Sequence, residues 1–340
     1  MTSGESGGRW ALPDDPDVEV KRFEFDVVSR HAGRRLDAYM AARFPEYSRT
    51  FIQALIRESA ITVNGQSVKP SHSPSLGDRV VALVPMRRHE EIPAEEIPLD
   101  IVFEDQWFVV VNKPPDLVVH PSKGHQTGTL VNALVHRFQK LSGLHGPLRP
   151  GIVHRLDRDT SGVLLVIKDE RVHEDIALQF ERREVQKEYV AVCEGVIELD
   201  SDLVDCPIGP DRRSHDRMLA GARGGKSAQT VYKVAERLAG FTVVRCFPKT
   251  GRTHQIRVHL KHVGHPIVAD SLYGRRDAVY LSELTGGEHD PEEEPLLDRQ
   301  ALHARRITIR HPMTGESMTF EAPMPEDMMR LIGALRRLAV

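Results

Sequence analysis

The chain has 340 residues, which fits two domains better than one, because single hydrophobic cores stop growing near about 250–300 residues. Apolar residues make up 40% and charged residues 28%, which excludes a wholly disordered chain, and no apolar run approaches the roughly 18 residues of a membrane helix. The net charge of −3 argues by itself against a nucleic-acid partner. Three cysteines without Cys-x-x-Cys spacing and an N terminus without a secretory pattern predict a cytoplasmic protein with no membrane anchor, disulfide framework or thiolate metal site.

Charge is distributed unevenly along the chain. Residues 212–261 contain twelve basic and two acidic side chains, a net +10, so the remaining residues carry −13. A solvated surface is one interpretation of this block, and a face that binds a polyanion is the one we favour. Arg223, Lys226 and Lys249 are the candidate phosphate contacts in it.

Acidic side chains concentrate in two Pro-containing stretches. Residues 282–298 hold seven acidic and no basic side chains, so we predict a solvated loop inserted within residues 275–298. Glu90, Glu91, Glu95 and Glu96 predict an interdomain linker over residues 86–98.

The first 85 residues predict a tail followed by a small module. Residues 1–20 lack hydrophobic periodicity, so we expect a disordered tail there. Residues 21–85 alternate helical and strand patterns and form a modestly basic module of two helices and a small sheet. The expected elements are a helix with Leu36, Met40 and Phe44 on one face, a second helix capped by Ser48 with Phe51, Ile52, Leu55 and Ile56 on one face, a hairpin around Asn64-Gly65, and a strand over 79–84.

Residues 99–340 mix strand and helix patterns without regular βαβ alternation, which predicts an α+β domain. The expected elements are a strand over 101–111, a helix over 128–138, a buried strand over 162–167, an amphipathic helix over 170–184 and a strand over 187–192.

A polar turn precedes the buried strand. The run HRLDRDTSG over residues 154–162 places Asp157 between Arg155 and Arg158, where nearby positive charge favours an ionised carboxylate. Such a carboxylate can act as a nucleophile or a base, although a plain surface ion pair would leave the same pattern. The earlier copy, Arg35-Leu36-Asp37, has no Thr-Ser-Gly after it and Leu36 fits the apolar face of a helix, so we interpret that copy as structural.

A second polar run, KTGRTHQIRVHL, covers residues 249–260. Its Arg252, His254 and Arg257 are hydrogen-bond donors suited to a phosphate or a base edge. The nearby histidines lack carboxylate or Cys partners at zinc-site spacing, so we expect no metal. The Gly224–Ser227 run ends like a P-loop, but no apolar strand precedes it, and we expect no nucleotide cofactor.

Together, these segments resemble the RNA pseudouridine synthases of the RluA/RluD type, and residues 21–85 resemble an S4 RNA-binding domain. The segments that carry the resemblance are VNKP from Val111, GIVHRLDRDTSG from Gly151, KEY from Lys187, GKSA from Gly225, TGRTHQIRVHL from Thr250, GHPI from Gly264, LYG from Leu272, LHA from Leu302 and HPMTGE from His311.

This resemblance implies isomerisation of uridine to pseudouridine in RNA, without cofactor or metal, on a bent, mixed and largely antiparallel sheet with flanking helices. It implies that Asp157 is the nucleophile towards the ribose or the base, that Arg155 helps to extrude the base, and that Tyr189 packs on the flipped uracil and is a candidate for proton transfer. Arg252 is then the expected ion-pair partner of Asp157, and Ile256 would line the base pocket. Excluding water from the detached uracil requires a closed pocket, which we expect to be apolar.

The resemblance also bears on the partner. An S4 module beside this catalytic domain implies large-subunit ribosomal RNA as the target, with transfer RNA as the alternative, and Arg35, Arg49 and Arg57 are the expected RNA contacts of the module. We expect a monomer. Two other functions are weighed against the isomerase: an S4-type RNA-binding or ribosome assembly factor without catalysis, and a metal-dependent RNA hydrolase that uses the histidines between His254 and His265.

Overall fold

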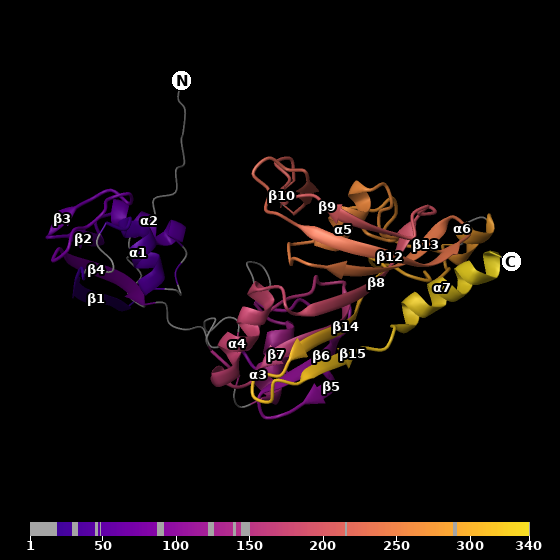
Figure 1. The fold of residues 1–340 in the computed structure, drawn as a ribbon, viewed down its shortest axis with the longest axis horizontal. Helices are drawn as coiled ribbons and strands as arrows, with labels where there is room; N and C mark the ends of the chain where they lie inside the picture. The colour runs from indigo at the N-terminus through magenta and orange to yellow at the C-terminus, as the bar shows by residue number, and fades with distance from the viewer. Residues whose placement is uncertain are drawn as a thin grey trace, which may run out of the picture. The chain divides into compact units, whose positions relative to one another are not determined.

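The computed structural model describes residues 19–28, 33–44, 47, 49–86, 92–121, 126–138, 141–143, 150–214, 216–287 and 291–339. The chain divides into two compact units, Met1–Glu91 and Ile92–Val340 (Figure 1). Among the described residues, no helix is long and apolar enough to cross a membrane.

The first unit is a four-stranded antiparallel sheet, in the order β1-β4-β2-β3, with two helices. Both predicted helices, the hairpin and the strand before the linker are confirmed, whereas β1 was not predicted. Glu19 and Val20 already belong to β1, so the predicted tail is wrong at its last two residues; residues 1–18 and Ser48 lie outside the described residues. The elements are β1 (Glu19–Asp26), α1 (Leu36–Arg43), α2 (Arg49–Arg57), β2 (Ile61–Val63), β3 (Gln66–Ser67) and β4 (Arg79–Met86).

The core of the first unit follows the helical periodicity of its sequence. Leu36 and Met40 of α1 and Ile52 and Ile56 of α2 are fully buried, and they pack against the sheet. The burial of Leu36 confirms the structural interpretation of the first Arg-Leu-Asp copy.

The second unit is built on a nine-stranded sheet in the order β5-β6-β7-β14-β8-β13-β12-β9, with β15 paired to β14. Among the described strands of this sheet, the β7–β14 pair is parallel and the others are antiparallel, which confirms the α+β class and the largely antiparallel sheet. The strands are β5 (Asp100–Glu104), β6 (Phe108–Lys113), β7 (Ser161–Ile167), β8 (Gln186–Glu194), β9 (Ser201–Asp205), β12 (Gln229–Leu238), β13 (Phe241–Pro248), β14 (Leu302–Arg310) and β15 (Ser317–Glu321), with β10 (Ile208–Pro210) and β11 (Met218–Ala220) forming a separate hairpin.

The single strand predicted over residues 101–111 is wrong, because the chain turns between β5 and β6. The carboxylate of Asp105 accepts hydrogen bonds from the backbone N–H groups of Trp107 and Phe108, at 2.7 and 2.8 Å. Such an Asx-type turn lets the two strands pair as a hairpin, and a search for apolar runs does not detect it.

Helices cover the sheet at several places (Figure 1). The predicted helices at α3 (Leu130–Arg137) and α4 (Glu170–Glu181) are confirmed with shorter bounds, while α5 (Gln255–His262) was not predicted. The remaining helices are α6 (Leu281–Thr285) and α7 (Glu326–Leu338).

The acidic segment is more ordered than a solvated loop. It contains α6, and Val279 and Leu297 form an isolated β-bridge with both side chains buried. A carboxylate oxygen of Glu293 accepts the backbone N–H of Ser282 at 3.0 Å. The prediction of a solvated loop over the whole segment is therefore wrong, because interleaved apolar residues anchor it to the core; residues 288–290 lie outside the described residues.

Candidate active site

The turn that carries Asp157 is fixed from behind by a buried lysine. The ammonium of Lys113, at the end of β6, donates to the carbonyl oxygens of Pro114, Leu117 and Arg158 at 2.7, 2.9 and 2.7 Å. Lys113 is completely buried, so these three acceptors replace its water. Asp157 is thereby presented from a rigid base rather than from a mobile surface turn.

The end of the same turn depends on a glycine. Gly162 has φ +116°, and a Cβ atom there would collide with the backbone of Ala304 on β14. The close approach occurs where β7 and β14 pair in parallel. The position requires glycine because of its positive φ and because there is no space for a Cβ atom. Beside it, Arg299 donates to the carbonyl oxygen of Asp159 at 3.0 Å and ties the turn to α7 through Asp327.

Asp157 is paired with an arginine of α5. Nη1 of Arg257 lies 3.1 Å from Oδ2 of Asp157, across 100 positions in the sequence. The other side of the same guanidinium binds Asp270, with Nε donating to Oδ2 at 2.7 Å and Nη2 to Oδ1 at 2.8 Å. Arg257 and Asp270 are buried, whereas the side chain of Asp157 keeps 19% of its surface exposed. The carboxylate that remains accessible is therefore Asp157.

The expected ion pair between Arg252 and Asp157 is not the one that forms. Nε of Arg252 donates to the carbonyl oxygen of Ser227 at 3.0 Å, and its backbone N–H binds Gln255. Arg252 lies in the turn that precedes α5, whereas Arg257 lies in the first turn of the helix itself. We correct the assignment: the partner of Asp157 is Arg257, which we had predicted as a substrate contact.

His254 also faces Asp157. Its Nε2 lies 4.0 Å from Oδ1 of Asp157, and its Nδ1 lies 2.8 Å from the hydroxyl of Tyr273. His254 adopts the left-handed conformation, with φ 55°, at the N-cap of α5. Burial lowers the pKa of the imidazole below its ordinary value, which favours the neutral ring.

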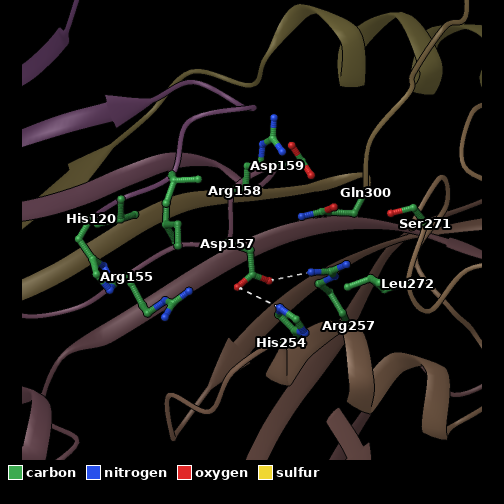
Figure 2. Close-up of a pocket in the computed structure, with 13 residues that line it drawn as sticks. His120, Arg155, Asp157, Arg158, Asp159, His254, Arg257, Ser271, Leu272 and Gln300 are labelled. Carbon is green, nitrogen blue, oxygen red and sulfur yellow. Dashed lines mark hydrogen bonds and ion pairs between the residues drawn. The ribbon is translucent and has the colours of Figure 1, made fainter. Parts of the chain in front are cut away.

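These groups line a cavity of about 260 Å³. Figure 2 shows Asp157 at its centre, with Arg257 and His254 joined to it by dashed lines and Arg155 on the opposite side. The lining is mainly polar, so the expected apolar pocket is wrong for this cavity: the turn that supplies Asp157 also contributes its charged neighbours. The lining residues are Val118, Val119, His120, Arg155, Leu156, Asp157, Arg158, Asp159, His254, Arg257, Ser271, Leu272 and Gln300.

Tyr189 and Ile256 pack in the apolar clusters of the second unit. Tyr189, on β8, packs against two apolar clusters, and burial together with the charge of Asp157 raises the pKa of its phenol above the ordinary value. Ile256 is 6% exposed in the core beneath α5. Neither residue is among those that line the described cavity.

The predicted RNA contacts are on the surface of their units. Arg223, Lys226 and Lys249 are exposed, as is Arg57 of α2. Arg35 and Arg49 are about half exposed, and both bind the fully buried carboxylate of Asp37. Asp37 thus fixes two arginines side by side in the first unit.

Sequence reasoning missed Asp270 and Tyr273 as site residues. Asp270 lies between the segments GHPI and LYG, and Tyr273 is the second residue of LYG; both segments served only for the family resemblance. A single Asp after a buried bridge has no local signal, because its role depends on Arg257 thirteen positions earlier. Within the described residues, no group of three or more His, Cys, Asp or Glu side chains could hold a metal ion.

Comparison with known proteins places the chain in a family. The family model described as RNA pseudouridylate synthase matches residues 107–262, and the S4 domain model matches residues 34–80. The chain is 43% identical over 318 residues to an uncharacterized RNA pseudouridine synthase, YlyB, of Bacillus subtilis. The aligned region covers 94% of this chain and 99% of that protein. The chain belongs to the RNA pseudouridine synthase family.

Two further comparisons agree with this membership. A protein of Pseudomonas aeruginosa named ribosomal large subunit pseudouridine synthase D is 39% identical over 319 residues, with 92% of this chain and 97% of that protein covered. The solved structure of human RNA pseudouridylate synthase domain containing 1 superposes with a TM-score of 0.50 at 28% identity, over 72% of this chain and 97% of that one. The resemblance inferred from the motifs is confirmed, and the chain is an RNA pseudouridine synthase, an isomerase.

Proposed function

We propose that the protein isomerises a specific uridine of large-subunit ribosomal RNA to pseudouridine, with Asp157 as the nucleophile. The observation that carries the proposal is the accessible carboxylate of Asp157, held at a cavity by the buried Arg257–Asp270 pair. The RNA class follows from relatives such as the Pseudomonas aeruginosa protein, which is named for the large ribosomal subunit.

The reaction requires one carboxylate and one cation rather than two acids. Breaking the C1′–N1 bond releases uracil as a delocalised anion, so the leaving group needs no general acid of the kind that a glycosidase supplies. In the proposal, Asp157 bonds to C1′ as the C1′–N1 bond breaks, and the released uracil anion turns. C5 then bonds to C1′ as the bond between Asp157 and C1′ breaks, the C5 proton passes to solvent, and N1 takes up a proton. Arg257 orients the carboxylate of Asp157 for the first of these steps.

The target base must leave its stack before reaching Asp157, at a cost of a few kcal/mol. Arg155 is exposed at the cavity wall facing Asp157, where it can occupy the place vacated by the base (Figure 2). Tyr189, which is partly buried and feels the charge of Asp157, is the proposed stacking surface for the extruded uracil, and Ile256 of the cluster against which Tyr189 packs extends its apolar side. Opening of the cavity wall toward Tyr189 accompanies binding in this proposal.

Affinity for RNA comes from exposed cations outside the cavity. Arg223, Lys226 and Lys249 of the second unit, together with Arg252, are proposed to contact phosphates. In the S4 unit, Arg35 and Arg49 on the shared Asp37, with Arg57, are proposed to do the same. We propose an S4 unit that runs from β1 to β4, residues 19–86, and a catalytic unit that begins at residue 92, in place of the predicted bounds of 21–85, 86–98 and 99–340.

The protein is proposed to work as a monomer in the cytoplasm, without a cofactor. Asp157, Arg257 and Asp270 all come from one chain, so the proposed centre needs no second copy.

Pseudouridine mapping tests the proposal. Large-subunit RNA from cells that lack the protein should miss at least one pseudouridine, which the wild-type gene restores and the Asp157→Asn gene does not. An RNA-binding factor without catalysis predicts instead that both genes restore the modification, or that no pseudouridine is missing.

A further inference from the structure

The structure assigns His254 and Asp157 together as the site that reads the 2′-hydroxyl of the target uridine. This inference rests on the proposed function, since it names the part of the nucleotide that the centre recognises. It makes His254 a determinant of specificity for ribose over deoxyribose.

The tautomer of His254 is set by Tyr273. The hydroxyl oxygen of Tyr273 accepts the backbone N–H of Met218 at 2.8 Å and lies 2.8 Å from Nδ1 of His254. Among the described residues, Nδ1 is the acceptor available to the hydroxyl hydrogen, so Tyr273 donates to it. The neutral imidazole then carries its hydrogen on Nε2, the atom that faces Asp157.

A donor and an acceptor are therefore held side by side without bonding each other. Nε2 of His254 lies 4.0 Å from Oδ1 of Asp157, and this distance is too long for a hydrogen bond. Arg257 occupies the other oxygen, Oδ2, and no hydrogen bond from the described residues reaches Oδ1. Both atoms belong to the cavity wall (Figure 2).

The spacing fits one bridging hydroxyl group. An oxygen at about 2.8 Å from each atom would make an angle of roughly 90° between them, which suits a hydroxyl that accepts one hydrogen bond and donates another.

The hydrogen-bonding groups of a uridine nucleotide identify the bridging group as the 2′-hydroxyl. The carbonyl oxygens of uracil can only accept and would be repelled by Asp157, while its N3–H can only donate. In an internal nucleotide the 3′ and 5′ oxygens are esterified, so the 2′-hydroxyl is the group that both donates and accepts. Its carbon neighbours C1′, where the glycosidic bond breaks.

The backbone conformation of His254 indicates that its side chain is held in one position. The left-handed conformation at φ 55° is unusual for a residue other than glycine or asparagine, and it persists only where the surroundings fix it. Here α5 begins at the next residue, and Tyr273 holds the ring in an edge-on contact with centroids 5.6 Å apart.

The test compares two synthetic RNA hairpins that carry the mapped uridine with either ribose or 2′-deoxyribose at that nucleotide alone. With tritium at C5, wild-type kcat/KM should favour ribose at least tenfold. His254→Asn, which suits the left-handed backbone but cannot reach the hydroxyl, should lose at least tenfold on ribose and little on deoxyribose. His254→Gln, whose amide N–H lies near the position of Nε2, should restore part of the preference.

Two variants separate this role from a structural one. Tyr273→Phe keeps the ring but frees the tautomer of His254, so the ribose preference should shrink without loss of RNA affinity. His262→Asn, at the exposed end of the same helix, should keep the wild-type preference. Equal losses on both RNAs in His254→Asn and His254→Gln, or no ribose preference in the wild type, would overturn the inference while leaving the isomerase intact. A wild-type protein inactive on both RNAs would overturn the proposed function as well.

Discussion

The carboxylate of Asp270 accepts two hydrogen bonds from the guanidinium of Arg257, of 2.7 and 2.8 Å, while Nη1 of the same guanidinium donates to Asp157. Oδ1 of Asp270 also accepts the backbone N–H groups of Leu272 and Tyr273, at 3.1 and 3.0 Å. The turn after the core of the sheet therefore determines where the arginine points, and the arginine determines how Asp157 is presented.

Asp270→Asn should weaken both fold and activity. The amide places a donor against the Arg257 fork, and breaking a buried ion pair costs about 3–5 kcal/mol. We expect the free energy of unfolding in urea to fall by about 3 kcal/mol and kcat to fall at least tenfold. The control is Glu236→Gln, which removes the exposed pair with Arg336 and should change stability by less than about 1 kcal/mol. Equal effects of the two substitutions would contradict this role.

Arg257→Lys and Arg252→Lys should behave differently. A lysine cannot reproduce the three contacts of Arg257, so kcat should fall by at least a hundredfold. Arg252 binds a carbonyl oxygen at the edge of the basic segment, so its replacement should mainly raise KM. Single-turnover kinetics on ribosomal RNA fragments separate the two effects. If Arg252→Lys lost more kcat than Arg257→Lys, the pairing would have to be reversed.

Acid should destabilise the catalytic unit through His303. Its ring is 1% exposed and contacts Ser161 at the start of β7, and burial lowers its pKa to about 4. An unfolded histidine has a pKa near 6.5, so between those values the unfolded chain binds more protons and the free energy of unfolding falls as the pH falls.

The measurement is urea unfolding at pH 7 and pH 5. The wild type should lose about 2 kcal/mol more between these values than His303→Gln, at about 1.4 kcal/mol per pH unit. His262→Gln, at an exposed position of α5, should keep the wild-type slope. An unchanged slope in His303→Gln would show that His303 does not titrate in this window.

Salt should weaken RNA binding steeply despite the acidic total charge. If Arg223 and Lys226 each hold a phosphate, replacing both with Gln should reduce the slope of log affinity against log salt by about 1.4 to 1.8. Arg330→Gln, on the exposed side of α7, is the matched control and should leave the slope unchanged. A slope that survives the double substitution would place the phosphate contacts elsewhere.

Local patterns predicted most of the fold. Some elements can be recognised from neighbouring residues alone. Examples are the helix with Leu36 and Met40 on one face, the hairpin at Asn64-Gly65 and the apolar strand β7, and each formed as predicted. The break at Asp105 was missed because a side-chain turn inside a strand-like run leaves its hydrophobicity intact.

The site could be predicted only in part, because its partners are distant in sequence. The flanking charges indicated Asp157, but the choice between Arg252 and Arg257 depends on whether the residue sits in the turn or on α5. Arg257 contributes to the +10 of the basic segment, yet two carboxylates neutralise it in the interior. Segment charge therefore overstates the number of cations available to RNA.

The most direct test of the account is tritium release from large-subunit ribosomal RNA labelled at C5 of uridine, with wild-type protein and Asp157→Asn. The account predicts release by the wild type and none above background by the variant, whose RNA affinity stays within about threefold because Asp157 is not one of the cations proposed to contact phosphates. Release by Asp157→Asn at a rate close to that of the wild type would contradict the assignment of Asp157 as the nucleophile.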